Sequence, residues 1–266
     1  MPRTRPLVPF ILLSLLCGLA RGVAPSAAGV AGSQSYAGTV TIATSCCSPV
    51  NAALVGFNFG EPPTFSSPIM LDNYDQYVPE LAARIPTSTN GDIRVVGGNE
   101  VITVRLKPGM RWSDGSPITA ADYVGALLLE TAPTVVSTTS QDWGFGCIAL
   151  GGPLAAATAI GTSLTLTFNG IFAAALDGCI PEPFPIEYFQ RKYHAVLPPA
   201  LLASFRTNRA AALYNSPSYR GSALQRLVDG WRHDPYTSPH DLFSGPYTLA
   251  SWRQGQPEVL IPNPYY

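Results

Sequence analysis

Residues that could do chemistry are sparse in this chain, and two His-Asp dipeptides in the last third are the first to consider. His233-Asp234 and His240-Asp241 each place an imidazole beside a carboxylate, which is a common ligand set for transition metals. Their spacing matches no helical or hairpin ligand pattern, and prolines interrupt the segment. A polar surface loop is therefore favoured over a metal site, and no cofactor is expected.

A second candidate lies near the N-terminus, where Cys46, Cys47 and Ser48 follow the alternating stretch Thr39–Ala43. That stretch predicts a short strand, and in α/β proteins ligands bind at the ends of the strands. We take these three residues as candidate ligand contacts, with plain burial of the cysteines as the alternative. Trp143, in an irregular polar segment, is a further candidate that could stack on a ligand or fill the core.

Cys147 and Cys179 form the candidate disulfide of an exported chain. Their bond would close a loop of about 32 residues, which stabilises a fold by roughly 3–4 kcal/mol on the chain-entropy model. A metal site is the alternative, but no Cys-x-x-Cys and no histidine at ligand spacing accompanies them.

Catalytic signatures are missing from the sequence. It contains no G-x-S-x-G elbow, no phosphate-binding G-x-x-x-x-G-K-[ST] loop and no H-E-x-x-H zinc helix. Asp114 precedes Gly115, and this dipeptide is typical of a tight turn rather than of a catalytic acid. The sequence therefore predicts a protein that is not an enzyme.

The first 28 residues are predicted to be an export signal. Arg3 and Arg5 precede an apolar run at Leu7–Leu19, and Ser26-Ala27-Ala28 offers a cleavage site. Cys17 allows a lipid anchor, although Leu16 stands where that motif needs a small residue. We expect a periplasmic or cell-surface protein that begins at residue 29 after cleavage.

Composition narrows the class of partner. Charged residues make up 12% of the chain and the net charge is −1. The surface therefore has no long-range positive electrostatic field that would attract nucleic acid. With 26 Pro and 24 Gly, the chain is expected to have short elements joined by many turns.

The elements that position these residues mix strands and helices. A hairpin is predicted over Ile93–Val96 and Val101–Leu106, and a strand over Leu164–Phe168. Helices are predicted at 187–194 and 199–211, and one or two helical turns near Leu224 and Val228. Residues 70–83 have a near-helical pattern. Residues 153–161 are expected to form a loop or a weak turn. Closing strands are expected at 248–252 and 259–261.

One stretch carries a recognisable signature: Trp112, Asp114, Gly115, Pro117, Thr119 and Asp122. Thr119 at the N-cap and an acid three residues later predict a capped helix that Pro133 ends. A second landmark follows about 130 residues later, where Gly245, Pro246 and Tyr247 precede a strand and then Asn263-Pro264-Tyr265.

These two landmarks in order resemble the extracytoplasmic solute-binding proteins of ABC importers, family 5, over roughly residues 36–266. The resemblance implies an α/β (α+β mixed) fold, the first lobe of a two-lobed clamp. It also implies a monomer that captures a peptide or similar small solute and delivers it to a membrane permease. The signature residues would be structural rather than ligand-contacting.

The resemblance also predicts that residues 29–266 are the N-terminal part of lobe one, without the second lobe and the returning strands. Such a chain alone would bind solute weakly or not at all. The alternatives are a secreted non-catalytic interaction domain and an exported enzyme. Which solute binds is not encoded in any motif of this sequence.

Overall fold

The computed structural model describes residues 64–133, 152–173, 175–176, 179–234, 238, 240–251, 253 and 259–266. The chain divides into two compact units, Met1–Ala43 and Thr44–Tyr266, and every described residue belongs to the second unit.

A five-stranded antiparallel sheet forms one layer of this unit, in the order β3-β4-β6-β5-β7. Its strands are β3 (Ile93–Val96), β4 (Asn99–Arg105), β5 (Leu154–Ile160), β6 (Ser163–Phe168) and β7 (Ser204–Arg206). Along β6 every second side chain is buried, as a half-covered sheet requires, and β4 follows the same pattern except that Thr103 is buried as well. The buried face therefore needs a covering layer.

The β3–β4 hairpin confirms the predicted strand pair. Gly97 and Gly98 form its two-residue turn, with φ of 58° and 82°. Both angles lie in the left-handed region that glycine enters without steric cost, and two such residues match the turn to the twist of the strands.

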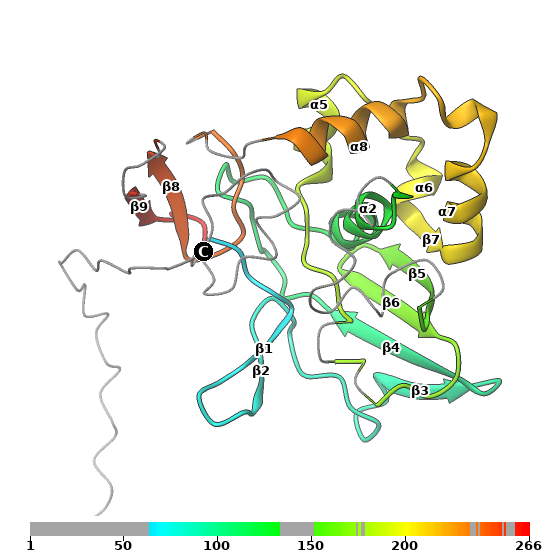
Figure 1. Ribbon diagram of the computed structural model, residues 1–266. Coiled ribbons are helices and arrows are strands. Elements are labelled where there is room, and N and C mark those ends of the chain that lie inside the picture. The colour runs from blue at the N-terminus through cyan, green and yellow to red at the C-terminus, as the bar shows by residue number, and fades with distance from the viewer. Residues whose placement is uncertain are drawn as a thin grey trace, which may run out of the picture. The chain divides into compact units, whose positions relative to one another are not determined.

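Helix α2 (Ala120–Glu130) covers the sheet and is the centre of the unit. Figure 1 shows it between the sheet and two further helices, α5 (Ile186–Lys192) and α8 (Ala223–His233). Every residue of α2 except Ala121 is buried, including two carboxylates and a tyrosine. A helix enclosed on all sides is normally apolar throughout, so these polar residues need an explanation.

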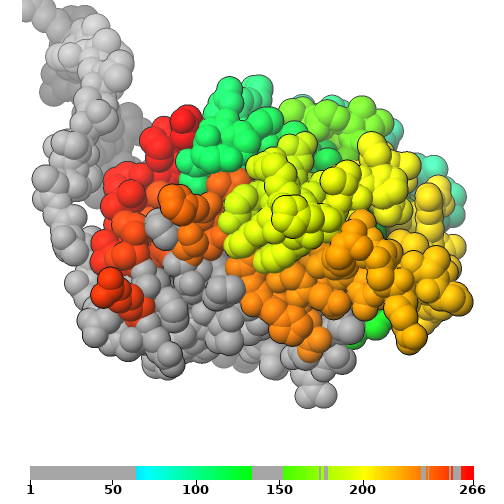
Figure 2. Space-filling view, turned by 90° about the horizontal axis from the view of Figure 1, so that it is seen from above, coloured from blue at the N-terminus to red at the C-terminus, as the bar shows by residue number. Residues whose placement is uncertain are grey.

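The remaining helices complete the outer layer. They are α6 (Pro199–Ala203), α7 (Thr207–Tyr214) and a 3-10 turn at Pro217–Tyr219. Figure 2 shows the segment from α5 to α8, coloured yellow-green to orange, as one continuous face. None of the described helices combines the length and apolar character needed to cross a bilayer.

Two separate hairpins flank these layers in the chain. The first pairs β1 (Ile69–Leu71) with β2 (Tyr77–Pro79), and the second pairs β8 (Tyr247–Ser251) with β9 (Val259–Pro262). The second confirms the predicted closing strands. The first corrects the near-helical pattern at 70–83: Asp72 folds the chain back by accepting the backbone N–H groups of Tyr74 and Gln76.

Three further predictions about elements were wrong in part. Residues 153–161 form strand β5 because they pair with both β6 and β7, although four of the seven strand residues are alanine. The helix predicted at 199–211 is split by β7, where Phe205 is buried against the sheet. Helix α8 is longer than one or two turns because four of its side chains pack inward. The mixed α/β class itself is confirmed.

Candidate functional site

The predicted ligand contacts Cys46, Cys47, Ser48 and Trp143 lie outside the described residues, as do the signal segment 1–28 and Cys147. Their roles remain predictions. The described residues contain three other regions of interest: the signature segment, a surface pocket beside it and the polar groups around α2.

The signature segment forms a rigid turn closed by its own side chains. Asp114 Oδ1 accepts the backbone N–H and the hydroxyl of Ser116, at 2.8 and 2.5 Å. Gly115 has φ of 85°, and a Cβ atom there would lie 2.9 Å from the Tyr265 ring. Trp112 beside the turn is buried. These contacts are all within the protein, so Asp114 acts in turn formation.

Thr119 and Asp122 close the start of α2. The Asp122 carboxylate accepts the Thr119 backbone N–H at 2.8 Å and the Thr119 hydroxyl at 3.1 Å. Its other oxygen accepts the backbone N–H of Ile186 at 3.3 Å. Burial raises the pKa of Asp122 to about 7, against the effect of these hydrogen bonds. Asp122 thus attaches the first turn of α5 to the first turn of α2.

The two sequence landmarks are joined in space. Ser113 N–H donates to the carbonyl of Phe243 at 3.0 Å, and Phe243 N–H donates to Ser113 Oγ at 3.1 Å. Gly245 N–H then donates to the Thr64 carbonyl, and the Pro246 carbonyl accepts Asn263 N–H. The segment around Gly245, Pro246 and Tyr247 therefore links the signature turn to the β8–β9 hairpin.

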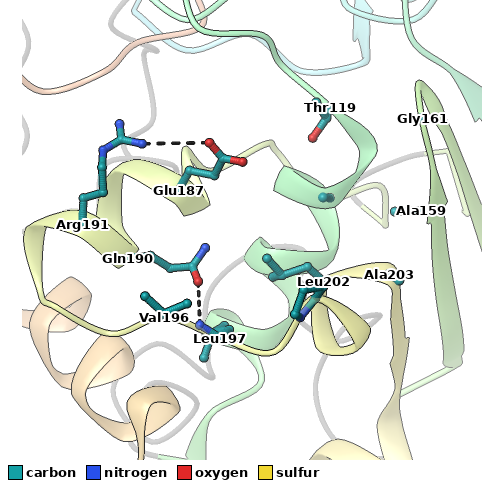
Figure 3. Close-up of a pocket in the computed structure, with 12 residues that line it drawn as sticks. Thr119, Ala159, Gly161, Glu187, Gln190, Arg191, Val196, Leu197, Leu202 and Ala203 are labelled. Atoms are coloured by element: carbon teal, nitrogen blue, oxygen red, sulfur yellow. Dashed lines mark hydrogen bonds and ion pairs between the residues drawn. The ribbon is translucent and has the colours of Figure 1, made fainter.

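A pocket of about 640 Å³ opens beside the N-terminus of α2. Figure 3 shows α5 on one side of it and the turn after β5 on the other. Its walls are mostly apolar, and the polar groups come from α5 and from Thr119. The lining residues are Thr119, Ala121, Ala159, Gly161, Glu187, Gln190, Arg191, Val196, Leu197, Pro199, Leu202 and Ala203.

The polar groups of this pocket are engaged with one another. Glu187 and Arg191 form an exposed ion pair at 3.9 Å, one helical turn apart, and Gln190 Oε1 accepts the Leu197 backbone N–H at 2.6 Å. Exposed pairs of this kind contribute little energy. The volume suits a small organic ligand. The arrangement offers apolar contact and an amide but no buried charge and no nucleophile.

The predicted surface loop at the His-Asp dipeptides was wrong for both aspartates. Asp234 and Asp241 are buried, and Lys192 Nζ lies 2.6 Å from the one and 2.9 Å from the other. Tyr188 and Tyr193 donate their hydroxyls to Asp241 and Asp234, respectively. We call these five residues the Lys192 network. Sequence reasoning missed it because Lys192 lies 42 residues before Asp234 and 49 residues before Asp241.

Other candidate ligands behave differently. Cys179 is fully buried and disulfide-bonded; its pairing with Cys147 stays a prediction. In the part of the chain that the structure describes, no group of three or more His, Cys, Asp or Glu residues is arranged to hold a metal ion. Tyr123 and Glu130 on α2 were overlooked, although a spacing of seven places them on one face of an otherwise apolar helix.

Comparison with known proteins gives a consistent result. The model of the bacterial extracellular solute-binding proteins, family 5, matches residues 76–266. A probable ABC transporter-binding protein from Deinococcus radiodurans is 22% identical over 193 residues, which cover 71% of this chain and 26% of the relative.

The fold is similar to that of the oligopeptide-binding protein of Thermus thermophilus, solved with a pentapeptide. The two share 17% identity with a TM-score of 0.54, over 82% of this chain and 36% of the Thermus chain. The chain thus spans about a quarter to a third of the length of these relatives.

Proposed function

The chain belongs to the bacterial extracellular solute-binding proteins of family 5, and from that premise we propose that it serves as the substrate-binding component of an ABC importer. Members of this family are binding proteins rather than enzymes. The observation that carries the proposal is the match of the family model over residues 76–266, which includes the signature turn, α2 and the β8–β9 hairpin.

The proposed solute is a peptide or a small molecule of similar size, handed to a membrane permease. The fold it shares with a protein solved with a bound pentapeptide supports this class of solute. The proposed place of action is outside the cytoplasm, after removal of residues 1–28. We retain Cys46, Cys47, Ser48 and Trp143 as proposed ligand contacts.

The described residues are proposed to form part of the first lobe of a two-lobed clamp. Closure of such a clamp is driven by ligand contacts that exist only in the closed state. Since the chain spans 36% of the length of the Thermus protein, we expect it to carry only part of those contacts. Affinity of the chain for a peptide is therefore expected to be weak.

Calorimetric titration of the 266-residue chain with tri- to pentapeptides at millimolar concentration tests this function. We expect saturable binding with a Kd near 1 mM, which corresponds to about −4 kcal/mol. Micromolar or tighter affinity would contradict the partial-clamp proposal. Absence of saturable binding to any peptide would contradict peptide binding and favour a secreted interaction domain.

A further inference from the structure

Three glutamates and one tyrosine form an acidic group around α2. We call Glu80, Tyr123, Glu130 and Glu182 the α2 carboxylate cluster. Tyr123 and Glu130 lie two turns apart on one face of α2, while Glu80 follows β2 and Glu182 precedes α5. Three segments far apart in the sequence therefore contribute acidic side chains to the cluster.

Two adjacent serines hold the outer carboxylates. Ser66 Oγ donates to Glu80 Oε1 at 2.7 Å, and Ser67 Oγ donates to Glu182 Oε1 at 3.0 Å. The hydroxyl of Tyr266 also donates to Glu80 Oε1, at 2.9 Å. Glu80 and Glu182 are half-buried, whereas Tyr123 and Glu130 are buried. The cluster thus runs from the surface into the interior.

The inner part of the cluster contains polar atoms with unmet hydrogen-bonding capacity. Tyr123 is completely buried, and its hydroxyl has no hydrogen-bond partner among the residues that the structure describes. The same holds there for Oε2 of Glu130, which is 5% exposed, and for Oε2 of Glu80. A buried polar atom without a partner costs about 1–3 kcal/mol. Such atoms are rarely kept in one region without a use.

Electrostatic effects indicate that these groups lie near one another. Burial, and then the charges of Asp122, Glu182 and Glu80, raise the pKa of Tyr123 well above its usual value. Burial, and then the charge of Glu182, raises the pKa of Glu130 to about 8. The charge of Glu182 therefore acts on both the Tyr123 hydroxyl and the Glu130 carboxyl, and the charge of Glu80 acts on the tyrosine as well.

Within the described residues, two carboxylates of the cluster form no ion pair. Every Lys and Arg after Arg21 lies in the described part of the chain, and within that part none forms an ion pair with Glu80 or Glu130. By contrast, Arg84 and Arg105 pair with Asp92, and Lys192 joins two aspartates. Among the described residues, the carboxylates of the cluster are also not grouped as ligands of a metal ion.

We propose that the α2 carboxylate cluster binds an ammonium or guanidinium group of the solute. The inference rests on the proposed solute-binding function and names the chemical class of solute. An organic cation donates several N–H groups in different directions, and hydrogen bonds to carboxylates are about twice as strong as neutral ones. It would enter between Glu80 and Glu182 and reach Glu130 and the oxygen of Tyr123.

Proton release accompanies this binding. Glu130 is mostly protonated at pH 7 in the empty protein, with Glu182 as the neighbouring charge that acts on it. A bound cation favours the carboxylate form, so Glu130 loses its proton on binding. Affinity for a cationic probe therefore rises with pH between about 6 and 8.

The experiment compares two probes that differ in the ammonium group alone: N-acetyl-trilysine amide and N-acetyl-trinorleucine amide. Each is titrated calorimetrically into the 266-residue chain at pH 7 in two buffers of different ionisation enthalpy. We expect the lysine probe to bind at least tenfold more tightly and to release close to one proton. Spermidine is titrated in parallel, and its binding would assign the site to amines in general rather than to basic peptides.

Variants locate the site. Glu130→Gln should reduce lysine-probe affinity at least tenfold and abolish proton release. Asp229→Asn on α8 likewise replaces a carboxyl group by an amide, but outside the cluster. It should alter neither the affinity for the lysine probe nor the proton release. Equal affinity for the two peptide probes, with no effect of Glu130→Gln, would overturn this inference and leave the proposed function standing. Absence of binding by every probe and every neutral peptide would overturn both.

Discussion

The Lys192 network and the α2 carboxylate cluster both combine carboxylates with tyrosines in or near the interior, but they differ in the hydrogen-bond and ion-pair partners of the buried acids. In the network, Lys192 Nζ contacts Asp234 and Asp241, and the hydroxyls of Tyr188 and Tyr193 complete the hydrogen bonding. In the cluster, serine and tyrosine hydroxyls meet the outer carboxylates, while Glu130 Oε2 and the Tyr123 hydroxyl lack partners within the described residues.

The difference shows two ways in which the energetic cost of burying a carboxyl group is reduced. A lysine at hydrogen-bond distance supplies the counter-charge, and the pair joins the elements that carry it; here α5 is joined to the end of α8 and to the loop after it. Without a cation the carboxyl keeps its proton, as burial raises the pKa of Glu130 to about 8. The first arrangement stabilises the fold, whereas the second is available for a ligand.

The largest expected effect is that of removing the cation from the network. Lys192→Met leaves Asp234 and Asp241 buried without their counter-charge, and we expect it to destabilise the protein by about 4 kcal/mol. Urea unfolding followed by circular dichroism measures the change. Arg191→Met removes the neighbouring but exposed cation of α5 and should cost less than about 1 kcal/mol. If both variants lowered the free energy of unfolding equally, the buried Lys192 ion pairs would be no more stabilising than the exposed Arg191 pair.

Next in size is the dependence of stability on pH. The pKa of Glu130 is about 8 in the folded protein and near 4.5 when unfolded, so its contribution is fully present below pH 4.5 and is lost as pH rises through 8. The amide side chain of the Glu130→Gln variant cannot ionise, so the free energy of unfolding of the variant should rise relative to that of the native protein between pH 4.5 and 8, by several kcal/mol at about 1.4 kcal/mol per pKa unit. Urea unfolding at several pH values tests this. Asp122 also titrates there, but it is common to both proteins and cancels. Parallel pH profiles would show that Glu130 is not the buried acid described here.

Two tyrosine-to-phenylalanine variants should differ in their effect on stability. Tyr188→Phe removes a hydrogen bond to Asp241 and is expected to destabilise by about 1.5 kcal/mol. Tyr123→Phe removes a buried hydroxyl without a partner in the described structure, and should leave stability unchanged or raise it by about 1 kcal/mol. Thermal unfolding of both variants decides the matter. Destabilisation by Tyr123→Phe would mean that this hydroxyl is already satisfied.

The smallest effect is expected at the pocket beside α2. Glu187→Gln breaks the exposed ion pair with Arg191, and we expect a change in stability of less than about 0.5 kcal/mol. Thermal unfolding at low and at high salt measures it. A larger, salt-dependent loss would place this pair among the stabilising ones and weaken the contrast between buried and exposed carboxylates.

Much of the local structure could be predicted because it depends on neighbours in sequence. The two glycines of the β3–β4 turn, the cap formed by Thr119 and Asp122, and the alternation along β6 are each encoded within a few residues. The order of the two landmarks predicted the family, which the match over residues 76–266 shows. Strand β5 and the break at β7 could not be predicted, because an alanine-rich strand becomes one by pairing with partners distant in the chain.

By itself the sequence determined the mixed α/β class, the position of the capped helix and the family of the protein. Tertiary structure alone decided the state of the buried acids. Folding brings Lys192 within 2.6 Å of Asp234, whereas no Lys or Arg of the described chain forms an ion pair with Glu130. Electrostatic interactions depend on distance in space and on burial, neither of which is written in the spacing of residues along a chain.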